Sequence, residues 1–306
     1  MHFIPTKCPN SKCSLAPHFI KKGFHYVRHL NRKYRIFQCK NCKRYFTSRT
    51  FRLDYRHKRS DLNRKVALLL VEGVSLRGIS RVEGLTYKNT YKKFLWLRKV
   101  VEQKKPTLLL TAKELFFDES ETIEHTKCKP LNIAMVVNEK YKILSMKVAV
   151  MPSKGRLAAI SRKKYGWRAN EREQKIQEAF ADVKNHLRAL PALIKSDMHP
   201  AYKRLVQQSF PGIPYSQYLG KEKKKKHQER LHESIRKRVY VPLWAVNHGG
   251  AMIRDRIKRL CRRNWCTTKK VENLQLQLDL YVLDNLGSLN LRPNSGVRME
   301  DFGGFG

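Results

Sequence analysis

Two aspartates, Asp118 and Asp197, stand at the ends of the segments that most resemble buried strands. Asp118 follows the apolar residues 115–117, LFF, and Asp197 follows residues 190–195, LPALIK. Acidic residues are scarce, 25 against 65 basic ones, yet three glutamates follow Asp118 at positions 119, 121 and 124. Carboxylates that meet at neighbouring strand ends can hold the divalent ions used in phosphoryl transfer. The plainer alternative is that they only solvate the end of a strand.

Four of the seven cysteines form two close pairs near the N-terminus, Cys8 with Cys13 and Cys39 with Cys42. Each pair suits a tight turn, and four thiolates complete the tetrahedral shell of a structural zinc ion. Residues 1–52 are therefore predicted to form a zinc ribbon with a β-prone, basic insert, which needs the metal to fold. Two disulfides or four free thiols are the alternatives. The odd number of cysteines argues against a complete disulfide framework and favours metal binding in a reducing cytoplasm.

Residues 60–101 are predicted to form a helix-turn-helix. Ser60 or Asp61 would cap the first helix, Ser75 the second and Thr86 the third. The third helix would be the recognition helix, and near its start it presents polar side chains that can contact DNA: Lys88, Asn89, Lys92 and Lys93. A plain three-helix bundle with a solvated basic face would give the same pattern.

From residue 110 to residue 286 the pattern predicts an α/β domain. Three strand-like segments joined by tight connections come first, and helices then alternate with two further strands. This is the order of a ribonuclease H-like mixed sheet, in which the first strand lies beside the fourth and brings Asp118 within reach of Asp197. Within this domain, residues 220–238 are predicted to be a flexible basic loop that binds phosphates without reading sequence. Residues 287–306 are predicted to be a disordered tail.

The composition restricts the classes of function. A chain of 306 residues allows two or three domains, and 41% hydrophobic residues is ordinary for a soluble globular protein. The net charge of +40 points first to nucleic acid, although an anionic membrane surface or a ribosomal role would give a similar total. The sequence has no run of about eighteen apolar residues and no signal-peptide core, so export and membrane spanning are not expected.

Several stretches of the sequence form a recognisable set: FQCKNCKRYFTSRTF, FFDESETIEHTKCKPL, MPSKGRLAAISRKKYG, SDMHPAY and PLWAVNHGGAMIRDRIKRLCRRNWCTTKK. Together with the predicted helix-turn-helix, and over about residues 8–285, they resemble bacterial insertion-sequence transposases with a zinc ribbon and a ribonuclease H-like domain of the DDE type. The resemblance implies cleavage at the element ends by a metal-activated water, followed by joining of the freed 3′-hydroxyl to target DNA. It also implies Asp118 and Asp197 as the first two ligands of Mg²⁺ or Mn²⁺.

The third position of the family's acidic triad departs from the pattern. Asn247 stands where the resemblance puts a glutamate, with His248 beside it. An amide oxygen or an imidazole can ligate a divalent ion, but the site then loses one negative charge. Glu121 and Glu272 are the acidic alternatives, although in an unbroken strand Ser120 rather than Glu121 shares the face of the first aspartate. An inactive copy without a metal is a further alternative.

The expected partners are double-stranded DNA, as terminal repeats and as target, and further copies of the chain in a synaptic complex. Arg162 or Lys163 would position the reacting phosphate. Such a protein would work in the bacterial cytoplasm, at the nucleoid. Two other functions stay open. One is a DNA-binding regulator that uses only the ribbon and the helix-turn-helix, and the other is a nuclease of the same fold that cuts without joining.

Overall fold

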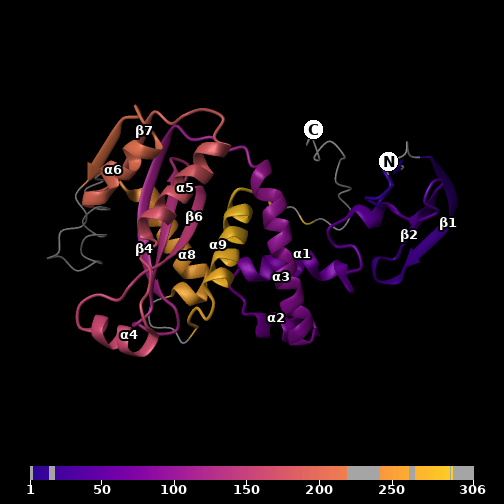
Figure 1. Ribbon diagram of the computed structural model, residues 1–306, viewed down its shortest axis with the longest axis horizontal. Helices are drawn as coiled ribbons and strands as arrows, with labels where there is room; N and C mark the ends of the chain where they lie inside the picture. The colour runs from indigo at the N-terminus through magenta and orange to yellow at the C-terminus, as the bar shows by residue number, and fades with distance from the viewer. Residues whose placement is uncertain (1–2, 14–17, 219–241, 262–265, 290, 292–306) are drawn as a thin grey trace, which may run out of the picture.

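The computed structural model describes residues 3–13, 18–218, 242–261, 266–289 and 291. Within them it contains a small three-stranded sheet, a group of helices and a five-stranded sheet flanked by further helices (Figure 1). The predicted basic loop at 220–238 lies outside the described residues, as does most of the predicted tail. Leu289 is buried against the core, so the prediction that a disordered tail begins at residue 287 is wrong for that residue.

The larger sheet is built from β4 (Glu114–Ile123), β5 (Pro130–Asn138), β6 (Ile143–Val150), β7 (Leu193–Asp197) and β8 (Tyr215–Tyr218). The strand order is β6-β5-β4-β7-β8, with β4 antiparallel to β5 and parallel to β7. The first strand of the sheet thus lies beside the fourth, and the predicted α/β fold class with a mixed sheet is confirmed. Strand β4 is longer than predicted, so Asp118 lies in its middle rather than at its end.

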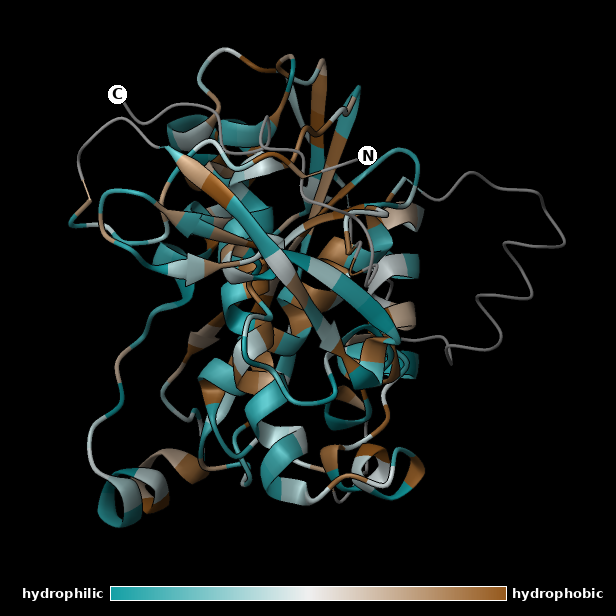
Figure 2. Ribbon diagram, turned by 90° about the vertical axis from the view of Figure 1, so that its right-hand side faces the viewer, coloured by the Kyte–Doolittle hydropathy of each residue, from teal (hydrophilic) through white to brown (hydrophobic). Residues whose placement is uncertain are grey.

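Helices cover both faces of this sheet and one of its edges. Helices α5 (Arg172–His186) and α6 (Pro200–Ser209) lie on one face, α8 (Trp244–Arg256) lies on the other, and α9 (Val271–Asn285) runs along β6 (Figure 1). Hydrophobic residues gather on the strands and on the helix faces turned toward them (Figure 2). Within the described ranges, no helix is both long and apolar enough to cross a bilayer.

Side chains of α9 complete the hydrogen bonds at the edge of β6. Gln275 accepts a bond from Val148 N at 2.8 Å and donates one to Met146 O at 2.9 Å. Asn285 accepts a bond from Ile143 N at 2.9 Å. These contacts replace the ladder bonds that another strand would make, so the edge offers few free backbone groups and α9 is fixed in register with the sheet.

The predicted helix-turn-helix region contains α1 (Asn63–Val71), α2 (Leu76–Val82) and α3 (Tyr87–Lys104). Two predicted caps are confirmed: Ser75 Oγ accepts from Gly78 N at 3.1 Å, and Thr86 Oγ1 accepts from Asn89 N at 3.3 Å. The prediction for the first helix is wrong. A 3₁₀ turn formed by residues 60–62 precedes α1, and neither Ser60 nor Asp61 caps it.

These helices are docked firmly on the sheet domain. Gly73 follows α1 with a φ of +77°, and a Cβ atom there would lie 1.9 Å from the carbonyl oxygen of Arg256 at the end of α8. Only glycine therefore fits this contact. Just after α3, Lys105 Nζ lies 2.7 Å from Asp279 and 3.5 Å from Asp182. The helices and the sheet share one continuous hydrophobic core as a result.

The N-terminal sheet is formed by β1 (Phe19–Val27), β2 (Arg32–Cys39) and β3 (Tyr45–Phe46), in that order. Its core is small, because only Phe37, Cys39 and Phe46 are buried together. Most of β1 is exposed, and the long strands at the front of Figure 2 mix hydrophilic and hydrophobic residues. So little buried apolar surface contributes only weakly to stability, which makes a further source of stability necessary here.

Lys93 was predicted to face DNA, and this prediction is wrong. The residue is only 5% exposed. Its ammonium group donates to Lys58 O at 3.2 Å, Arg59 O at 2.8 Å and Asn63 Oδ1 at 2.6 Å. Burial lowers the pKa of Lys93. The side chain therefore fixes the segment that leads from the ribbon into α1, whereas its neighbour Lys92 is exposed.

We expect Lys93→Ala to lower the free energy of unfolding by about 2 kcal/mol, because it leaves buried oxygen acceptors without a donor. Lys92→Ala removes the same charge from an exposed site and is expected to change stability by less than about 0.5 kcal/mol. Urea unfolding of the two variants measures the difference. Equal stability of the two variants would contradict the structural role of Lys93.

Candidate active site and metal centre

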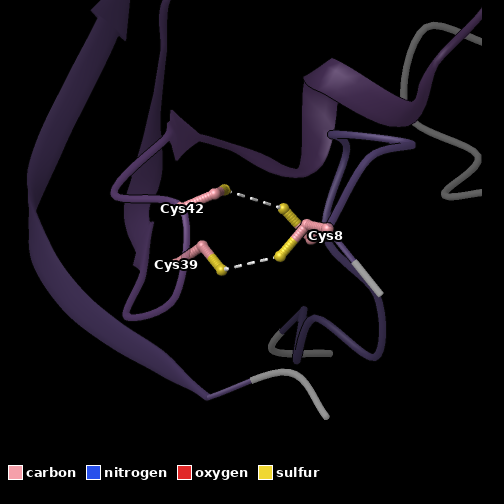
Figure 3. A group of neighbouring side chains, drawn as sticks. Cys8, Cys39 and Cys42 are labelled. Carbon is pink, nitrogen blue, oxygen red and sulfur yellow. Dashed lines mark hydrogen bonds between the residues drawn. The ribbon is translucent and has the colours of Figure 1, made fainter. Parts of the chain in front are cut away.

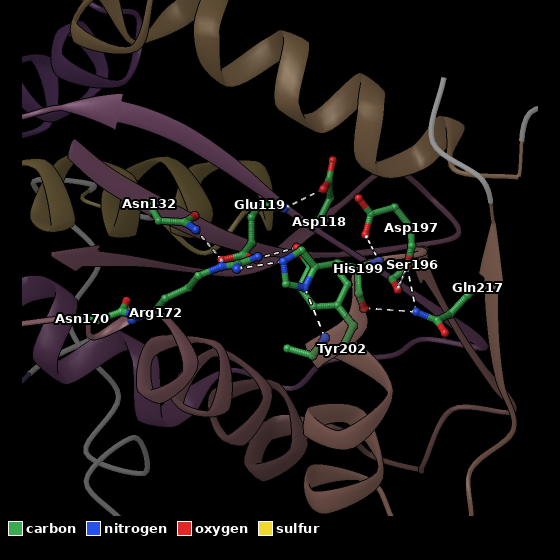
Figure 4. Close-up of polar contacts among 11 residues, drawn as sticks. Asp118, Glu119, Asn132, Asn170, Arg172, Ser196, Asp197, His199, Tyr202 and Gln217 are labelled. Carbon is green, nitrogen blue, oxygen red and sulfur yellow. Dashed lines mark hydrogen bonds and ion pairs between the residues drawn. The ribbon is translucent and has the colours of Figure 1, made fainter. Parts of the chain in front are cut away.

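Asp118 and Asp197 lie side by side because β4 and β7 pair in parallel. The paired register ends one residue before each aspartate, so the two are the next residues on adjacent strands, which lie about 4.8 Å apart. Figure 4 shows both carboxylates on the α8 side of the sheet. Asp118 accepts a bond from Glu119 N at 2.7 Å, and Asp197 accepts one from His199 N at 3.2 Å. The structure therefore brings together the two aspartates that the sequence singled out.

The environment of this pair favours the protonated form of Asp118. Burial raises the pKa of Asp118 to about 6, and the negative charges of Asp197 and Glu119 act in the same direction. The bond from Glu119 N and the positive charge of Arg254 oppose the rise in pKa without cancelling it. Two neighbouring carboxylates that are both ionised repel each other, and a bound cation would offset this repulsion.

Helix α8 brings the guanidinium of Arg254 near this pair and has Asn247, rather than a carboxylate, at the third predicted position. Arg254 Nη1 donates to Ser120 Oγ on β4 at 3.4 Å. Asn247 lies seven residues earlier, which is about two helical turns, so it shares the flank of Arg254. The bond to Ser120 also shows that Ser120 lies on the α8 side of β4, as the alternation along the strand predicts.

The other candidates for a third ligand are not brought to the pair. His248 is exposed, and its ring centroid lies 5.7 Å from that of Tyr141. Glu121 is exposed and alternates onto the opposite face of β4, and Glu272 is exposed in the first turn of α9. Across the described part of the chain, the cysteine cluster is the only group of three or more such ligands. Asn247 is the remaining candidate, and it lies on the same flank of α8 as Arg254.

A second polar centre, which the sequence did not predict, surrounds Glu119 on the opposite face of β4. The Glu119 side chain is 6% exposed and accepts hydrogen bonds from Arg172, Tyr202 and Asn132 (Figure 4). Arg172 Nε lies 2.9 Å from both carboxylate oxygens, and Tyr202 Oη lies 2.5 Å from one of them. Burial and the charge of Glu119 raise the pKa of Tyr202, and the bonds to Glu119 raise the pKa of Arg172.

This centre links the two strands that carry the aspartates. Arg172 Nη1 also contacts His199 Nε2 at 2.9 Å, and the backbone N–H of His199 bonds Asp197. Glu119 directly follows Asp118, so one chain of contacts joins both aspartates from behind the sheet. The sequence offered one signal, since alternation puts Glu119 on the opposite face from Asp118. Its partners come from α5 and α6, and no local pattern identifies them.

The four predicted zinc ligands form a cluster in the ribbon. Their sulfur atoms all lie within 4.8 Å of one another, with Cys8 and Cys42 at 3.5 Å and Cys13 and Cys39 at 3.8 Å (Figure 3). These distances exceed the disulfide bond length of about 2 Å. Four sulfurs bound to zinc at about 2.3 Å would be about 3.8 Å apart in a tetrahedron. The cluster could therefore hold a metal ion such as zinc.

The chemistry of the cluster also suits a cation. The backbone N–H of Arg44 lowers the pKa of Cys42 to about 6, whereas burial and the neighbouring thiols raise the pKa of Cys13 to about 12. Asn10 N also points at Cys8 Sγ, at 3.5 Å. A divalent metal binds thiolates, and its charge favours release of the protons that the cluster otherwise retains.

The remaining predicted site residues are on the surface. Lys88, Asn89 and Lys92 are exposed on the first turns of α3. Arg162 and Lys163 are exposed on α4 (Leu157–Tyr165), beyond the end of β4. No protein-family model matches the chain, and a search of curated proteins gave no significant match. A functional assignment therefore has to rest on the geometry and the motifs.

We expect Asp118→Asn to stabilise the protein at pH 8 in magnesium-free buffer. A pKa raised from 3.8 to about 6 means that the ionised carboxylate destabilises the fold by about 3 kcal/mol. The penalty is nearly complete above about pH 7, declines as the pH falls and disappears well below pH 3.8, where the folded and unfolded chains are both protonated. Urea unfolding between pH 4 and 8 tests this. Asp255→Asn, at an exposed position on α8, is the control, and an equal effect there would contradict the argument.

We expect removal of the cluster metal to unfold the ribbon but not the five-stranded sheet, because the ribbon core is too small to fold alone. The chain should release one metal ion, measured with a metal-indicator dye, and Cys39→Ser should abolish that release. Cys128→Ser, outside the cluster, should retain the metal. Backbone amide spectra would show which residues lose order. A ribbon that stays ordered without metal would refute this prediction.

Proposed function

We propose that this protein is a DNA transposase in which Asp118 and Asp197 hold a divalent metal ion against a DNA phosphate. The observation that carries the proposal is the parallel pairing that sets these two carboxylates side by side, where the pKa of Asp118 is raised. Buried like charges are costly, and sites that use them bind cations or protons. A chain with a net charge of +40 is suited to an anionic polymer as the source of that phosphate.

Each residue of the site has a distinct role in this proposal. Asp118 and Asp197 hold the ion, and the amide oxygen of Asn247 supplies a weak neutral ligand. When bound, Mg²⁺ or Mn²⁺ lowers the pKa of a coordinated water and neutralises charge on the phosphate. Arg254 lies near the pair and attracts the phosphate oxygens, while the Glu119 centre keeps both strands in place from behind.

The remaining modules fit the recognition of DNA ends. The start of α3 offers Lys88, Asn89 and Lys92 for contacts in the major groove, with Thr86 capping the helix. We assign zinc to the cysteine cluster, because four thiolates leave no open position and so make the metal structural. Its role is to order the ribbon next to α1, where His29 contacts Ser60 at 3.1 Å.

One observation favours a second candidate function. Asn247 and Arg254 together give the α8 side of the site less negative charge than a third carboxylate would, which weakens metal binding. A protein with this charge balance could bind DNA at the element ends without cutting, as a regulator. A nuclease that cuts without joining shares all the observations that support the transposase.

We expect Asp118→Asn and Asp197→Asn each to reduce DNA cleavage and strand joining at least about 100-fold, because each loses a charged metal ligand. The substrate is a duplex carrying the sequences that flank the coding segment, assayed with Mg²⁺ or Mn²⁺. Affinity for this duplex should stay within about twofold, and Asp255→Asn should keep full activity.

The outcomes separate the three functions. Metal-dependent cleavage with joining supports the transposase, and cleavage without joining supports the nuclease. Specific binding without cleavage by the wild-type protein supports the regulator. Cleavage that survives both aspartate substitutions would reject Asp118 and Asp197 as the site.

A further inference from the structure

One basic segment, which includes Arg162 and Lys163, lies outside the aspartate pair and the Glu119 centre. We define the α4 arm as residues 153–168, which contain α4 and project away from the sheet (Figure 1). No acidic residue occurs between positions 152 and 170. Two large apolar side chains are exposed, Ile160 at 55% and Trp167 at 79%. The arm also carries five exposed cations: Lys154, Arg156, Arg162, Lys163 and Lys164.

The arm is a fixed structure rather than a loose loop. Ser153 Oγ and Ser161 Oγ both donate to Cys128 O, at 2.8 and 2.7 Å. Arg168 Nη1 bonds Glu124 at 3.0 Å, and Lys129 Nζ lies 4.9 Å from the centroid of the Tyr165 ring. These contacts bind the arm to the connection between β4 and β5. The exposed cations are therefore presented on an ordered support, so a ligand pays little of the entropy of ordering the backbone.

The arm lies at the end of the sheet toward which β4 runs from Asp118, because it is bonded to the residues that follow β4. Strand β6 runs parallel to β4, since both are antiparallel to β5, and α4 follows the carboxyl end of β6. From Asp118 to Ile123 is five residues, or about 17 Å of strand. Base pairs are stacked about 3.4 Å apart, so this corresponds to about five base pairs. A duplex with one phosphate at the pair can therefore reach the arm.

We propose that the α4 arm binds the phosphate backbone of duplex DNA next to the reacting phosphate, independently of base sequence, with Trp167 against a sugar or base. This rests on the proposed function, which puts a DNA phosphate at the aspartate pair. Arg and Lys on one helix face contact phosphates and carry no sequence information directly. The arm thus suits DNA of no fixed sequence, such as target or flanking DNA, whereas α3 is suited to the element ends.

The charge of the chain favours DNA over other partners. A second copy would bring the same five cations and a net charge of +40, so the two arms would repel each other. A membrane would require a continuous apolar stripe, but the exposed apolar residues of the arm are separated by charged ones. The favoured partner is therefore a polyanion wide enough to contact both ends of the arm.

The test compares two triple variants that lose equal charge. The arm variant replaces Arg156, Arg162 and Lys163 with Gln, which keeps side-chain length and helix propensity. The control variant replaces Lys113, Lys140 and Arg188 with Gln. These exposed residues lie near the other end of the strands, where β4 begins and β5 ends. Each is titrated with a 30-base-pair duplex of arbitrary sequence, without divalent metal and at several salt concentrations. Thermal unfolding confirms that both remain folded.

We expect the arm variant to bind at least tenfold more weakly and to lower the salt dependence of log K by about two to three, as loss of three phosphate contacts requires. The control variant should lose less than about threefold. Quenching of tryptophan fluorescence by the duplex should decrease in Trp167→Phe. Equal loss of affinity in both triple variants, or full affinity of the arm variant, would overturn the proposal.

Two further measurements distinguish the alternatives. Binding to vesicles with 30% phosphatidylserine that depends on the arm while DNA binding does not would overturn the proposal in favour of a membrane. A change in sedimentation of the arm variant alone, with unchanged DNA affinity, would overturn it in favour of self-association. Arm-dependent DNA binding by a wild-type protein that never cleaves would support the arm and reject the transposase, so the two failures are distinguishable.

Discussion

The parallel pairing of β4 with β7 is the constraint on which the rest of the structure depends. It sets side by side two carboxylates that lie about eighty positions apart in the sequence, at a cost visible in the raised pKa of Asp118. The pairing is resistant to change because both strands are interior ones. Strand β4 is bonded to β5 on its other side, and β7 is bonded to β8. Separating the aspartates would therefore break hydrogen bonds on both sides and expose the buried residues 115–117.

Two adjacent carboxylates on β4 differ in how far the fold compensates their charge. Glu119 has an arginine, a tyrosine and an asparagine as donors, so its charge is fully compensated. Asp118 has one backbone N–H and the more distant charge of Arg254, and its pKa remains raised. A group that the fold leaves under-compensated next to a like charge is one that gains most from binding a cation. Composition alone could not make this distinction, because both residues belong to the same acidic run.

The parts that could be predicted from the sequence depend on local rules. The spacing of the cysteines and the caps at Ser75 and Thr86 follow from short-range patterns, whereas the strand order follows from the succession of strands and helices along the chain. Lys93 lies three residues from Thr90 and four from Leu97, so it shares their buried face of α3. Its residue type suggested exposure, and the prediction followed the residue type. The donors to Glu119 and the orientation of His248 could not be predicted, because they depend on how α5, α6 and α8 pack on the sheet.

The continuous core between the three helices and the sheet limits what one chain can do to DNA. Gly73 packs on the end of α8, Gln277 donates to Leu70 O, and Lys105 bridges to α9, so the start of α3 has a fixed relation to the aspartates. In the proposed function, a duplex held by α3 would therefore meet the carboxylate pair at a distance that the fold sets. One pair acts on one phosphate at a time. If the proposal holds, processing the two ends of a DNA segment would require at least two chains, which is a physical reason to propose an oligomer on DNA.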